Sequence, residues 1–348
     1  INYEQIRKIG ELLKTKELGK PLNFYSYTLP DGTEVVDDKK FPPLNHPFAV
    51  DFIFAVTMQE FGSWLGSDDA GECSHNPNAV HGYTTPIWAV AGGKRLKGSD
   101  FLWTASRRML NKQKDFFSPE RLAVAKYATV ERWLADDTGQ VPYPNRNLRM
   151  RLSLARLYGI DMVRNNKYPR DIIGDANKST NPLKIFLQSM ARLPGYGGDR
   201  LHKKSLLLAM TLASRPECFL CIAPDDPAWE PIVDSHYMRI GLRTGMVDPG
   251  EWKLYVEERC VKPMEPGEIK VPYIPEKGER AIREKTFEAM REVARIANKS
   301  SVQLDFPLWD ARRYCPEMEK PNCPACPLTM ACQKRTTLFQ PVLHTTHY

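Results

Sequence analysis

The chain has 348 residues, of which 42% are hydrophobic, and its formal net charge is +7. This length is enough for one large domain or two lobes with a sizeable core, and the ordinary apolar content indicates a globular protein. No apolar run reaches the length of a membrane-spanning helix, so we expect no membrane partner. The moderate basic excess suits a polyanionic partner without proving one.

Helical patterns dominate the chain. Apolar residues at helical spacing, together with start signals such as Ser118-Pro119, predict helices at residues 3–18, 48–64, from 98 and from 118 onward, 145–158, 182–192, 201–212, 250–260 and 277–298. Residues 25–36 instead predict a short hairpin around Pro30-Asp31-Gly32. Strand signals are scarce beyond the first fifty residues, so the expected fold class is mainly α.

A glycine turn separates two of the expected helices. Residues 193–199 read Leu-Pro-Gly-Tyr-Gly-Gly-Asp, so Gly195 and Gly197 flank Tyr196. A Gly-x-Gly turn exposes backbone N–H groups at the start of the following helix, where they can hold a phosphate, and Lys203 and Lys204 could add charge. The same pattern also occurs as an ordinary connection between helices.

A single carboxylate stands out downstream of this turn. Asp234 follows the apolar pair Ile232-Val233 and precedes a helix-like run. Partial desolvation in such a place suits a general base or a carboxylate that stabilises a cation. Asp is also a preferred helix N-cap, which is the alternative interpretation.

Half of the eight cysteines lie close together near the end of the sequence. They form a C-x7-C-x2-C-x5-C pattern made by Cys315, Cys323, Cys326 and Cys332. The first residues show no signal-peptide pattern, so we expect a reducing cytoplasmic location in which thiols ligate metals. Four thiolates at short spacing bind zinc or an iron–sulfur cluster.

In this order, the turn, the aspartate and the cysteines resemble the helix–hairpin–helix DNA glycosylase superfamily, especially its iron–sulfur branch typified by endonuclease III. The resemblance covers roughly residues 183–333. It implies that the hairpin binds the DNA backbone through Gly195, Tyr196 and Gly197, and that Asp234 is the catalytic carboxylate. It also implies that the four cysteines hold a structural [4Fe–4S] cluster, although the family spacing is x6-x2-x5; zinc remains the alternative.

The same resemblance implies two helical lobes. Residues 48–212 would form a helical barrel lobe that ends in the helix–hairpin–helix. Residues 1–47 and 213–348 would form the second lobe, which carries the catalytic aspartate and the cluster loop.

Lyase members of the family use a lysine just after the second hairpin glycine to attack the sugar. Here the ungapped match is Asp199, and Lys203 and Lys204 lie about one helical turn later. We therefore expect hydrolysis by water without strand cleavage. A shift of one turn that makes Lys203 the nucleophile is the alternative.

Further candidates lie outside these motifs. Gln59 and Glu60 match a place where family members insert a glutamine into the gap left by a flipped base, so Gln59 is a candidate DNA contact and Glu60 a candidate catalytic carboxylate. The alternative is an exposed helix face. Tyr196 is expected to be exposed and able to stack on a base. Two sets complete the list: the carboxylates Asp51 and Asp305, and a phosphate patch or solvated face formed by Arg146, Arg149 and Arg151.

A second resemblance is to the queuosine-salvage nucleosidase family, at residues 88–107, 203–207 and 304–310. That family shares the glycosylase fold, lacks the cysteine cluster and cleaves the N-glycosidic bond of a 7-deazaguanine nucleotide. Both resemblances imply a carboxylate working at a sugar–base bond.

The leading hypothesis is a monomeric, monofunctional N-glycosylase that excises a damaged or modified base from duplex DNA, associated with the nucleoid of a prokaryote or a phage-infected cell. Three alternatives remain: a nucleosidase for a free 7-deazaguanine-type nucleoside or nucleotide, a phage-type enzyme that modifies DNA bases on the same fold, and a DNA-binding module without activity.

Overall fold

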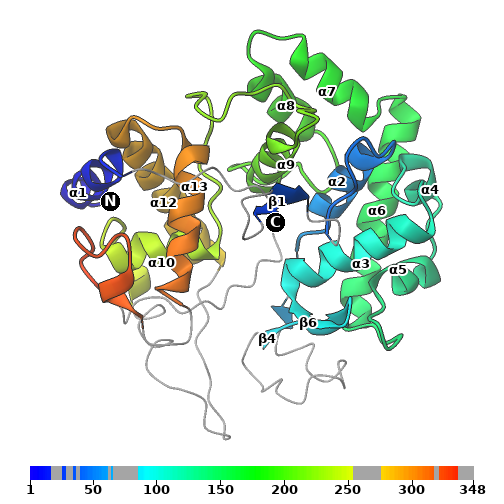
Figure 1. Ribbon diagram of the computed structural model, residues 1–348, viewed down its shortest axis with the longest axis horizontal. Helices are drawn as coiled ribbons and strands as arrows, with labels where there is room; N and C mark the ends of the chain where they lie inside the picture. Colours follow the sequence, from blue (N-terminus) through cyan, green and yellow to red (C-terminus); the bar gives the residue numbers. More distant parts are fainter. Residues whose placement is uncertain are drawn as a thin grey trace, which may run out of the picture. The chain divides into compact units, whose positions relative to one another are not determined.

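The structure is a computed structural model that describes residues 1–16, 26–28, 34–36, 40–61, 64–65, 85–253, 276–316 and 321–335. Within these ranges the fold is mainly helical, as predicted (Figure 1). None of the helices described there is both long enough and apolar enough to cross a membrane.

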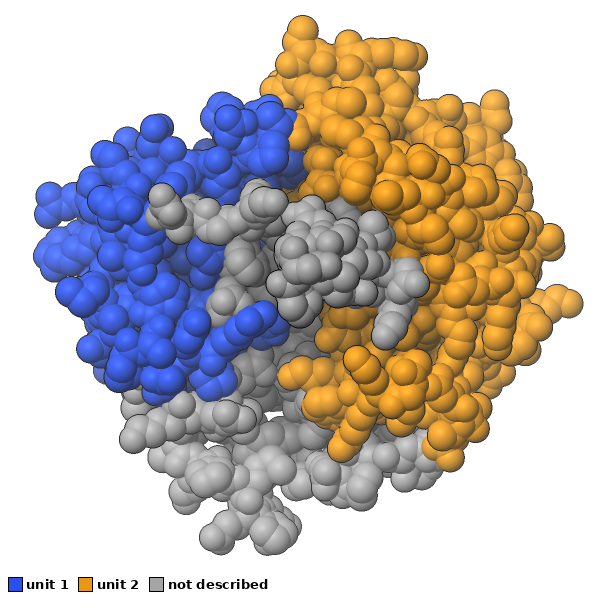
Figure 2. Space-filling view, in the orientation of Figure 1, with its two compact units in different colours: residues 1–22, 223–344 blue, residues 23–222, 345–348 orange. Residues whose placement is uncertain are grey.

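The chain divides into two compact units (Figure 2). Residues 23–222 and 345–348 form one of them, here called the central unit. Residues 1–22 and 223–344 form the other, here called the terminal unit. Compared with the boundaries that the resemblance implied, residues 23–47 and 213–222 group with the central helices.

The central unit holds most of the helices and three small antiparallel pairs of strands. Its helices are α2 (Ala49–Met58), α3 (Gly98–Lys112), α4 (Pro119–Ala123), α5 (Tyr127–Leu134), α6 (Asn145–Asn165), α7 (Pro169–Asn177), α8 (Pro182–Met190) and α9 (Lys203–Ser214). Its strands pair as β1 (Ser26–Thr28) with β2 (Glu34–Val36), β3 (Trp64–Leu65) with β4 (Thr85–Pro86), and β5 (Trp88–Ala91) with β6 (Lys94–Lys97).

Helix α2 is the core of the central unit. Every residue from Ala49 to Met58 except Asp51 is buried, and the helix packs against α3, α7 and α9. A helix that is apolar on all sides is stable only when other elements surround it. Its neighbours α8 and α9 carry the glycine turn, so this packing fixes where the turn lies.

Close packing also sets the position of α6, which contacts α4 and α5. A Cβ atom at Gly159 would lie 2.4 Å from the backbone nitrogen of Ala123 and 2.5 Å from the carbonyl oxygen of Pro119. Only glycine permits this approach. Ser118 caps α4, with Pro119 in its first turn, which confirms the predicted start of this helix.

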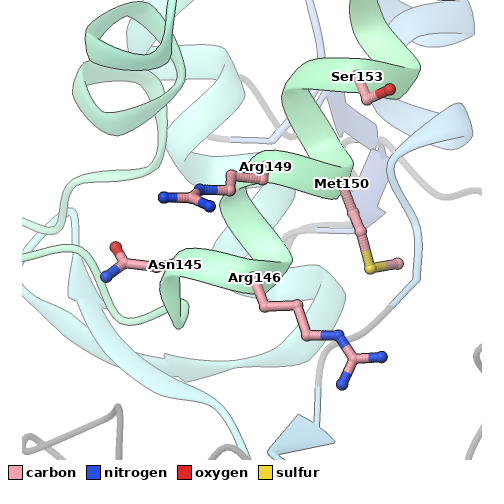
Figure 3. Close-up of a pocket in the computed structure, with 5 residues that line it drawn as sticks. All are labelled: Asn145, Arg146, Arg149, Met150 and Ser153. Atoms are coloured by element: carbon pink, nitrogen blue, oxygen red, sulfur yellow. The ribbon is translucent and has the colours of Figure 1, made fainter.

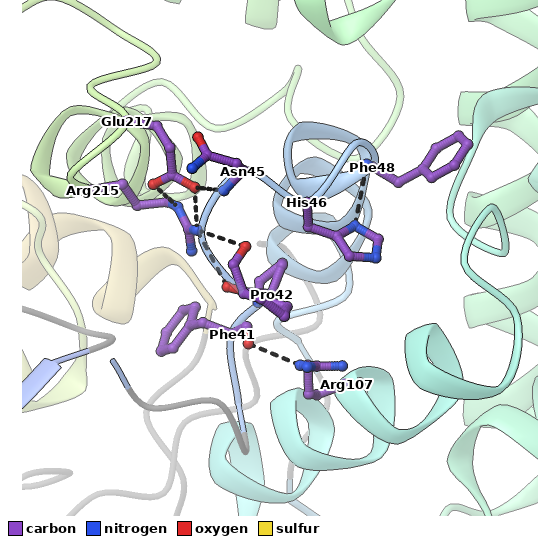
Figure 4. A network of polar contacts seen from close by, with 9 residues as sticks. Phe41, Pro42, Asn45, His46, Phe48, Arg107, Arg215 and Glu217 are labelled. Atoms are coloured by element: carbon purple, nitrogen blue, oxygen red, sulfur yellow. Dashed lines mark hydrogen bonds and ion pairs between the residues drawn. The ribbon is translucent and has the colours of Figure 1, made fainter. Parts of the chain in front are cut away.

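A buried ion pair ties the segment before α2 to the end of α9 (Figure 4). Arg215 forms an ion pair of 2.6 Å with Glu217, and Glu217 Oε1 accepts a hydrogen bond of 3.0 Å from the backbone nitrogen of Asn45. Arg107 on α3 donates to the carbonyl oxygen of Phe41 at 2.9 Å. These contacts explain why residues 40–47 and 213–222 group with the central unit.

The terminal unit is built on α1 (Tyr3–Lys14), α10 (Ser235–Thr244), η2 (Gly250–Trp252), α12 (Glu276–Ala297), α13 (Ser301–Asp310), η4 (Ala311–Arg313) and η5 (Cys323–Ala325). Helix α12 packs against α1, α10 and α13. A Cβ atom at Gly10 of α1 would lie 2.6 Å from the side chain of Ile296, so these two helices also pack closely.

Several expected boundaries were wrong. The helix expected over residues 48–64 ends at Met58, and Trp64–Leu65 forms a strand. The helix expected at 145–158 continues to Asn165, and the pair β5–β6, joined through Gly92-Gly93, was not expected. The predicted hairpin at 25–36 is confirmed by β1 and β2, whereas its turn lies outside the described residues. Of the helix expected at 250–260, the structure describes only η2 and Lys253.

Candidate functional site

The glycine turn joins α8 to α9 as predicted, and both flanking glycines are needed. Gly195 has φ +84°, and a Cβ atom there would lie 2.6 Å from Cγ of Met58. A Cβ atom at Gly197 would lie 2.5 Å from the carbonyl oxygen of Ala191. The turn therefore lies directly against α2 and the end of α8.

Asp199 accepts two backbone hydrogen bonds at the start of the second helix of this hairpin. Its Oδ1 accepts from the backbone nitrogen of Leu201 at 3.1 Å, and its Oδ2 accepts from that of Lys203 at 2.8 Å. The N-cap residue is His202, whose backbone is left-handed with φ +51°, and α9 begins at Lys203 rather than at residue 201. The carboxylate therefore accepts hydrogen bonds from two of the backbone N–H groups that were expected to bind a phosphate.

Tyr196 is buried, so the expectation of an exposed stacking aromatic was wrong. Only 2% of the residue is exposed. Its hydroxyl donates to the carbonyl oxygen of Phe54 at 2.5 Å, and the two rings pack edge to face. The ring is held inside because α2 supplies both an apolar surface and an acceptor for the hydroxyl.

Buried cations hold the carboxyl end of α2. Lys204 Nζ donates to the carbonyl oxygens of Met58 at 3.0 Å and of Gly195 at 3.4 Å. Arg151 donates to the carbonyl oxygen of Gln59 at 2.6 Å and also to that of Phe61. Cations suit this end of a helix because its last carbonyls carry a partial negative charge.

This arrangement corrects the predicted roles of three side chains. Burial, with the nearby charges of Lys203 and Arg151, lowers the pKa of Lys204 to about 7. Its amine lies inside the central unit, not on a phosphate-binding surface. Gln59 has no exposed surface and donates to the carbonyl oxygen of Arg151 at 3.1 Å, so it is neither the expected DNA contact nor part of an exposed face. Arg151 likewise belongs to the core.

Glu60 lies next to the hairpin. Trp103 Nε1 donates to Glu60 Oε1. Burial raises the pKa of this carboxyl, and the indole hydrogen bond and the charges of Lys203 and Lys204 act in the opposite direction. The structure therefore brings Glu60 and both hairpin lysines together. Asp51 lies separately in the first turn of α2, where burial raises its pKa to about 7.

The expected phosphate patch is only partly on the surface. Arg146 and Arg149 are exposed in the first turns of α6, where they line a surface pocket together with Asn145, Met150 and Ser153 (Figure 3). The third predicted member, Arg151, is buried as described above.

In the terminal unit, Asp234 is the N-cap of α10. Its backbone is extended, and its Oδ1 accepts from the backbone nitrogen of Tyr237 at 2.9 Å. The residue is only partly buried. The positive end of the helix favours a negative charge at this place. The N-cap interpretation is thus confirmed, and capping by itself does not exclude a catalytic role.

A second carboxyl lies beside Asp234. The hydroxyl of Tyr237 donates to Oδ1 of Asp305 on α13 at 2.7 Å, and Asp305 is only 6% exposed. Burial raises the pKa of Asp305 to about 7, the charge of Asp234 adds to this effect, and the tyrosine hydrogen bond opposes it. Two neighbouring carboxyl groups in different environments are typical of acid–base sites.

Helix α10 also connects Asp234 to the cysteines. Arg239 donates to the carbonyl oxygen of Cys315 at 3.0 Å, and Arg243 donates to Sγ of Cys315 at 3.2 Å and to the carbonyl oxygen of Pro316 at 2.7 Å. Both arginines are buried. Sequence reasoning missed them, although their positions five and nine residues after Asp234 would have placed them on the helix that it starts.

All four clustered cysteines are free thiols and partly exposed. Burial raises the pKa of Cys326 and of Cys332, and the neighbouring cysteines contribute in the same direction. The backbone nitrogen of Lys334 donates to Sγ of Cys332 at 3.2 Å. Among the described residues, no group of three or more His, Cys, Asp or Glu side chains forms a ready-made site for a metal ion.

Comparison with known proteins finds no matching family model and no matching curated protein.

The buried carboxyl of Asp305 predicts a specific pH dependence. Its folded pKa lies above the unfolded one, so the native state binds a proton that the unfolded chain releases, and stability falls as pH rises from about 4 to about 7. In Asp305→Asn this loss disappears. We expect the free energy of unfolding of the variant, measured with urea, to rise relative to that of the parent by on the order of 2 kcal/mol between about pH 5 and pH 8.

Two comparisons make this result specific. The pH dependence of stability that Asp51 contributes is the same in the parent and in Asp305→Asn, so it cancels in the comparison. Glu11→Gln, which removes an exposed carboxylate of α1, should follow the parent at both pH values. If the free energies of unfolding of the parent and of Asp305→Asn changed in parallel with pH, the raised pKa of Asp305 would be contradicted.

Proposed function

We propose that the protein is an N-glycosylase that hydrolyses the bond between a base and its deoxyribose in DNA. The observation that carries the proposal is a pair of carboxyl groups that both accept hydrogen bonds from Tyr237: Asp234, partly exposed at the start of α10, and the buried Asp305 of α13. The motif that contains Asp234, the hairpin sequence and the four cysteines support it.

In this mechanism the chain supplies charge at the sugar. Cleavage of an N-glycosidic bond develops positive charge on the sugar carbon, and the carboxylate of Asp234 stabilises that charge or deprotonates the attacking water. The Tyr237 backbone bond orients the carboxylate before the reaction. The raised pKa of Asp305 favours its protonated form, so that no second full negative charge lies beside the carboxylate of Asp234.

Hydrolysis by water fits the hairpin better than a lysine nucleophile does. The position that carries the lysine in lyase members of the superfamily is Asp199, which accepts backbone hydrogen bonds at the start of α9. Lys204, although its lowered pKa would suit a nucleophile, donates to two backbone carbonyls and is buried. We therefore propose a monofunctional enzyme, with Lys203 as the remaining candidate if strand cleavage is observed.

The four cysteines fit a [4Fe–4S] cluster in their chemistry. They are four free thiols, and two of their sulfurs accept N–H hydrogen bonds, from Arg243 and from Lys334, of the kind that stabilise ligating thiolates. When bound, the cluster would pin the loop from Cys315 to Cys332 and take no part in the reaction. Zinc is the alternative ligand of the same donors.

One observation favours a second candidate, a nucleosidase for a free modified nucleoside or nucleotide. Asp199 occupies two N–H groups at the start of α9, and Tyr196 and Lys204 point into the core. These features make the hairpin less suited to a DNA phosphate than its sequence suggests. A nucleosidase would release the base from a small molecule and bind duplex DNA weakly.

The activity prediction concerns Asp234. Duplex DNA carrying a set of damaged or modified bases, incubated with the protein and then treated with alkali, should break at the abasic sites formed. Asp234→Asn keeps an oxygen to cap α10 but removes the charge, so we expect base release to fall at least about 100-fold. Asp226→Asn is the matched control, because Asp226 also caps a backbone nitrogen, that of Ala228 at 2.8 Å.

Equal activity of Asp234→Asn and the parent would reject the proposal. Base release from free nucleosides but not from DNA would replace it with the nucleosidase, and conversion of a base without release would replace it with a base-modifying enzyme.

The cluster prediction is spectroscopic. Protein purified without oxygen should be brown, with a broad absorption band near ~400 nm and about four iron atoms per chain. Cys326→Ser should lose the band, whereas Cys221→Ser, which changes an exposed cysteine outside the group of four, should keep it. A colourless protein that contains one zinc would contradict the iron–sulfur assignment.

A further inference from the structure

Helix α6 presents one face to the surface along its whole length. Helices α4 and α5 pack against α6 on other sides. Exposed residues recur every three or four positions from Arg146 to Arg164, so they form a single stripe of about 27 Å at 1.5 Å per residue. We call this stripe the α6 face.

The α6 face is strongly basic. It exposes Arg146, Arg149, Arg156 and Arg164. None of these four arginines forms an ion pair or a hydrogen bond with another side chain in the part of the chain that the structure describes. The first two line the pocket shown in Figure 3. Four exposed arginines outnumber Asp161, the one carboxylate of α6, so the face favours an anionic partner.

The same face is also apolar. Met150 is 40% exposed, Leu157 54%, Ile160 44% and Val163 40%. Single exposed apolar residues are ordinary, but several on one stripe mark an interaction surface.

The arginines and the exposed aliphatic side chains of the α6 face together indicate which class of partner it binds. Phosphates of duplex DNA would pair with the arginines but leave Leu157 and Ile160 exposed to water. Single-stranded nucleic acid stacks on aromatic side chains, and the exposed residues named above include none. A second copy of this face would bring its arginines against like charges.

We propose that the α6 face is a docking surface for an amphipathic helix of a partner protein, whose apolar stripe is flanked by aspartate and glutamate. The apolar stripe would cover Leu157, Ile160 and Val163, and the flanking carboxylates would pair with the arginines. A carboxylate at one end of that helix would enter the pocket between Arg146 and Arg149. This role is independent of the proposed glycosylase activity.

The test uses a synthetic helical peptide of about 18 residues, the length of the α6 face, with leucine on one stripe and glutamate on both flanks. The 348-residue protein should bind it, as measured by fluorescence anisotropy. Arg149→Glu combined with Arg156→Glu should weaken binding at least about 10-fold and confer binding to the same peptide with lysine in place of glutamate. Leu157→Ser combined with Ile160→Ser should weaken binding of the glutamate peptide without conferring binding to the lysine peptide.

Matched controls are Arg132→Glu, an exposed arginine of α5, and Leu44→Ser, an exposed leucine of the same unit; both should bind like the parent. Circular dichroism should show every variant folded. The proposal is overturned if the parent binds the lysine peptide as well as the glutamate peptide, or binds neither. It is also overturned if the α6 variants lose binding to an ~18-base-pair duplex or to phosphatidylserine vesicles but keep binding to the glutamate peptide.

Discussion

The carboxyl end of α2 is held by two buried cations. Lys204 and Arg151 donate to the backbone carbonyls of Met58, Gln59 and Phe61. A buried cation is costly unless its donors are satisfied, and here the partial negative charge of the helix end and the Phe61 ring compensate it. Because Lys204 also binds the carbonyl oxygen of Gly195, the same interaction fixes the hairpin against the core of the central unit.

The terminal unit uses helix α10 in a comparable way. Its first turn is capped by Asp234, and its buried arginines, Arg239 and Arg243, reach the loop that begins at Cys315. A cluster bound to the four cysteines would therefore act on the reaction through position, by fixing the helix whose N-terminus holds the carboxylate. The proposed cluster would therefore have a structural role and would take no part in the reaction.

Sequence patterns correctly predicted the features that depend on interactions between residues close together in the sequence. Apolar spacing predicted the helices, Ser118-Pro119 predicted the start of α4, and Asp234 was recognised as a possible cap because its partner, Tyr237, lies three residues away. The same reasoning failed where the partner is distant in sequence.

Distant partners explain the errors at the candidate site. Gln59 bonds to a carbonyl 92 residues away, and Tyr196 to one 142 residues away. No spacing pattern contains those pairs, so a polar side chain on an apolar helix was expected to face solvent. The link from Tyr237 to Asp305 spans 68 residues, and for the same reason Asp305 was only one of several candidate carboxylates.

The proposed mechanism requires the charge of Asp234 to stabilise a cation at a sugar carbon. Duplex DNA with a pyrrolidine ring in place of one deoxyribose mimics that cation, and a tetrahydrofuran ring gives the matched neutral analogue, so the identity of the base does not matter. We predict that the parent binds the pyrrolidine duplex at least about 10-fold more tightly than the tetrahydrofuran duplex, and that Asp234→Asn loses this preference. Equal affinity of the parent for both duplexes, or an unchanged preference in Asp234→Asn, would contradict the account.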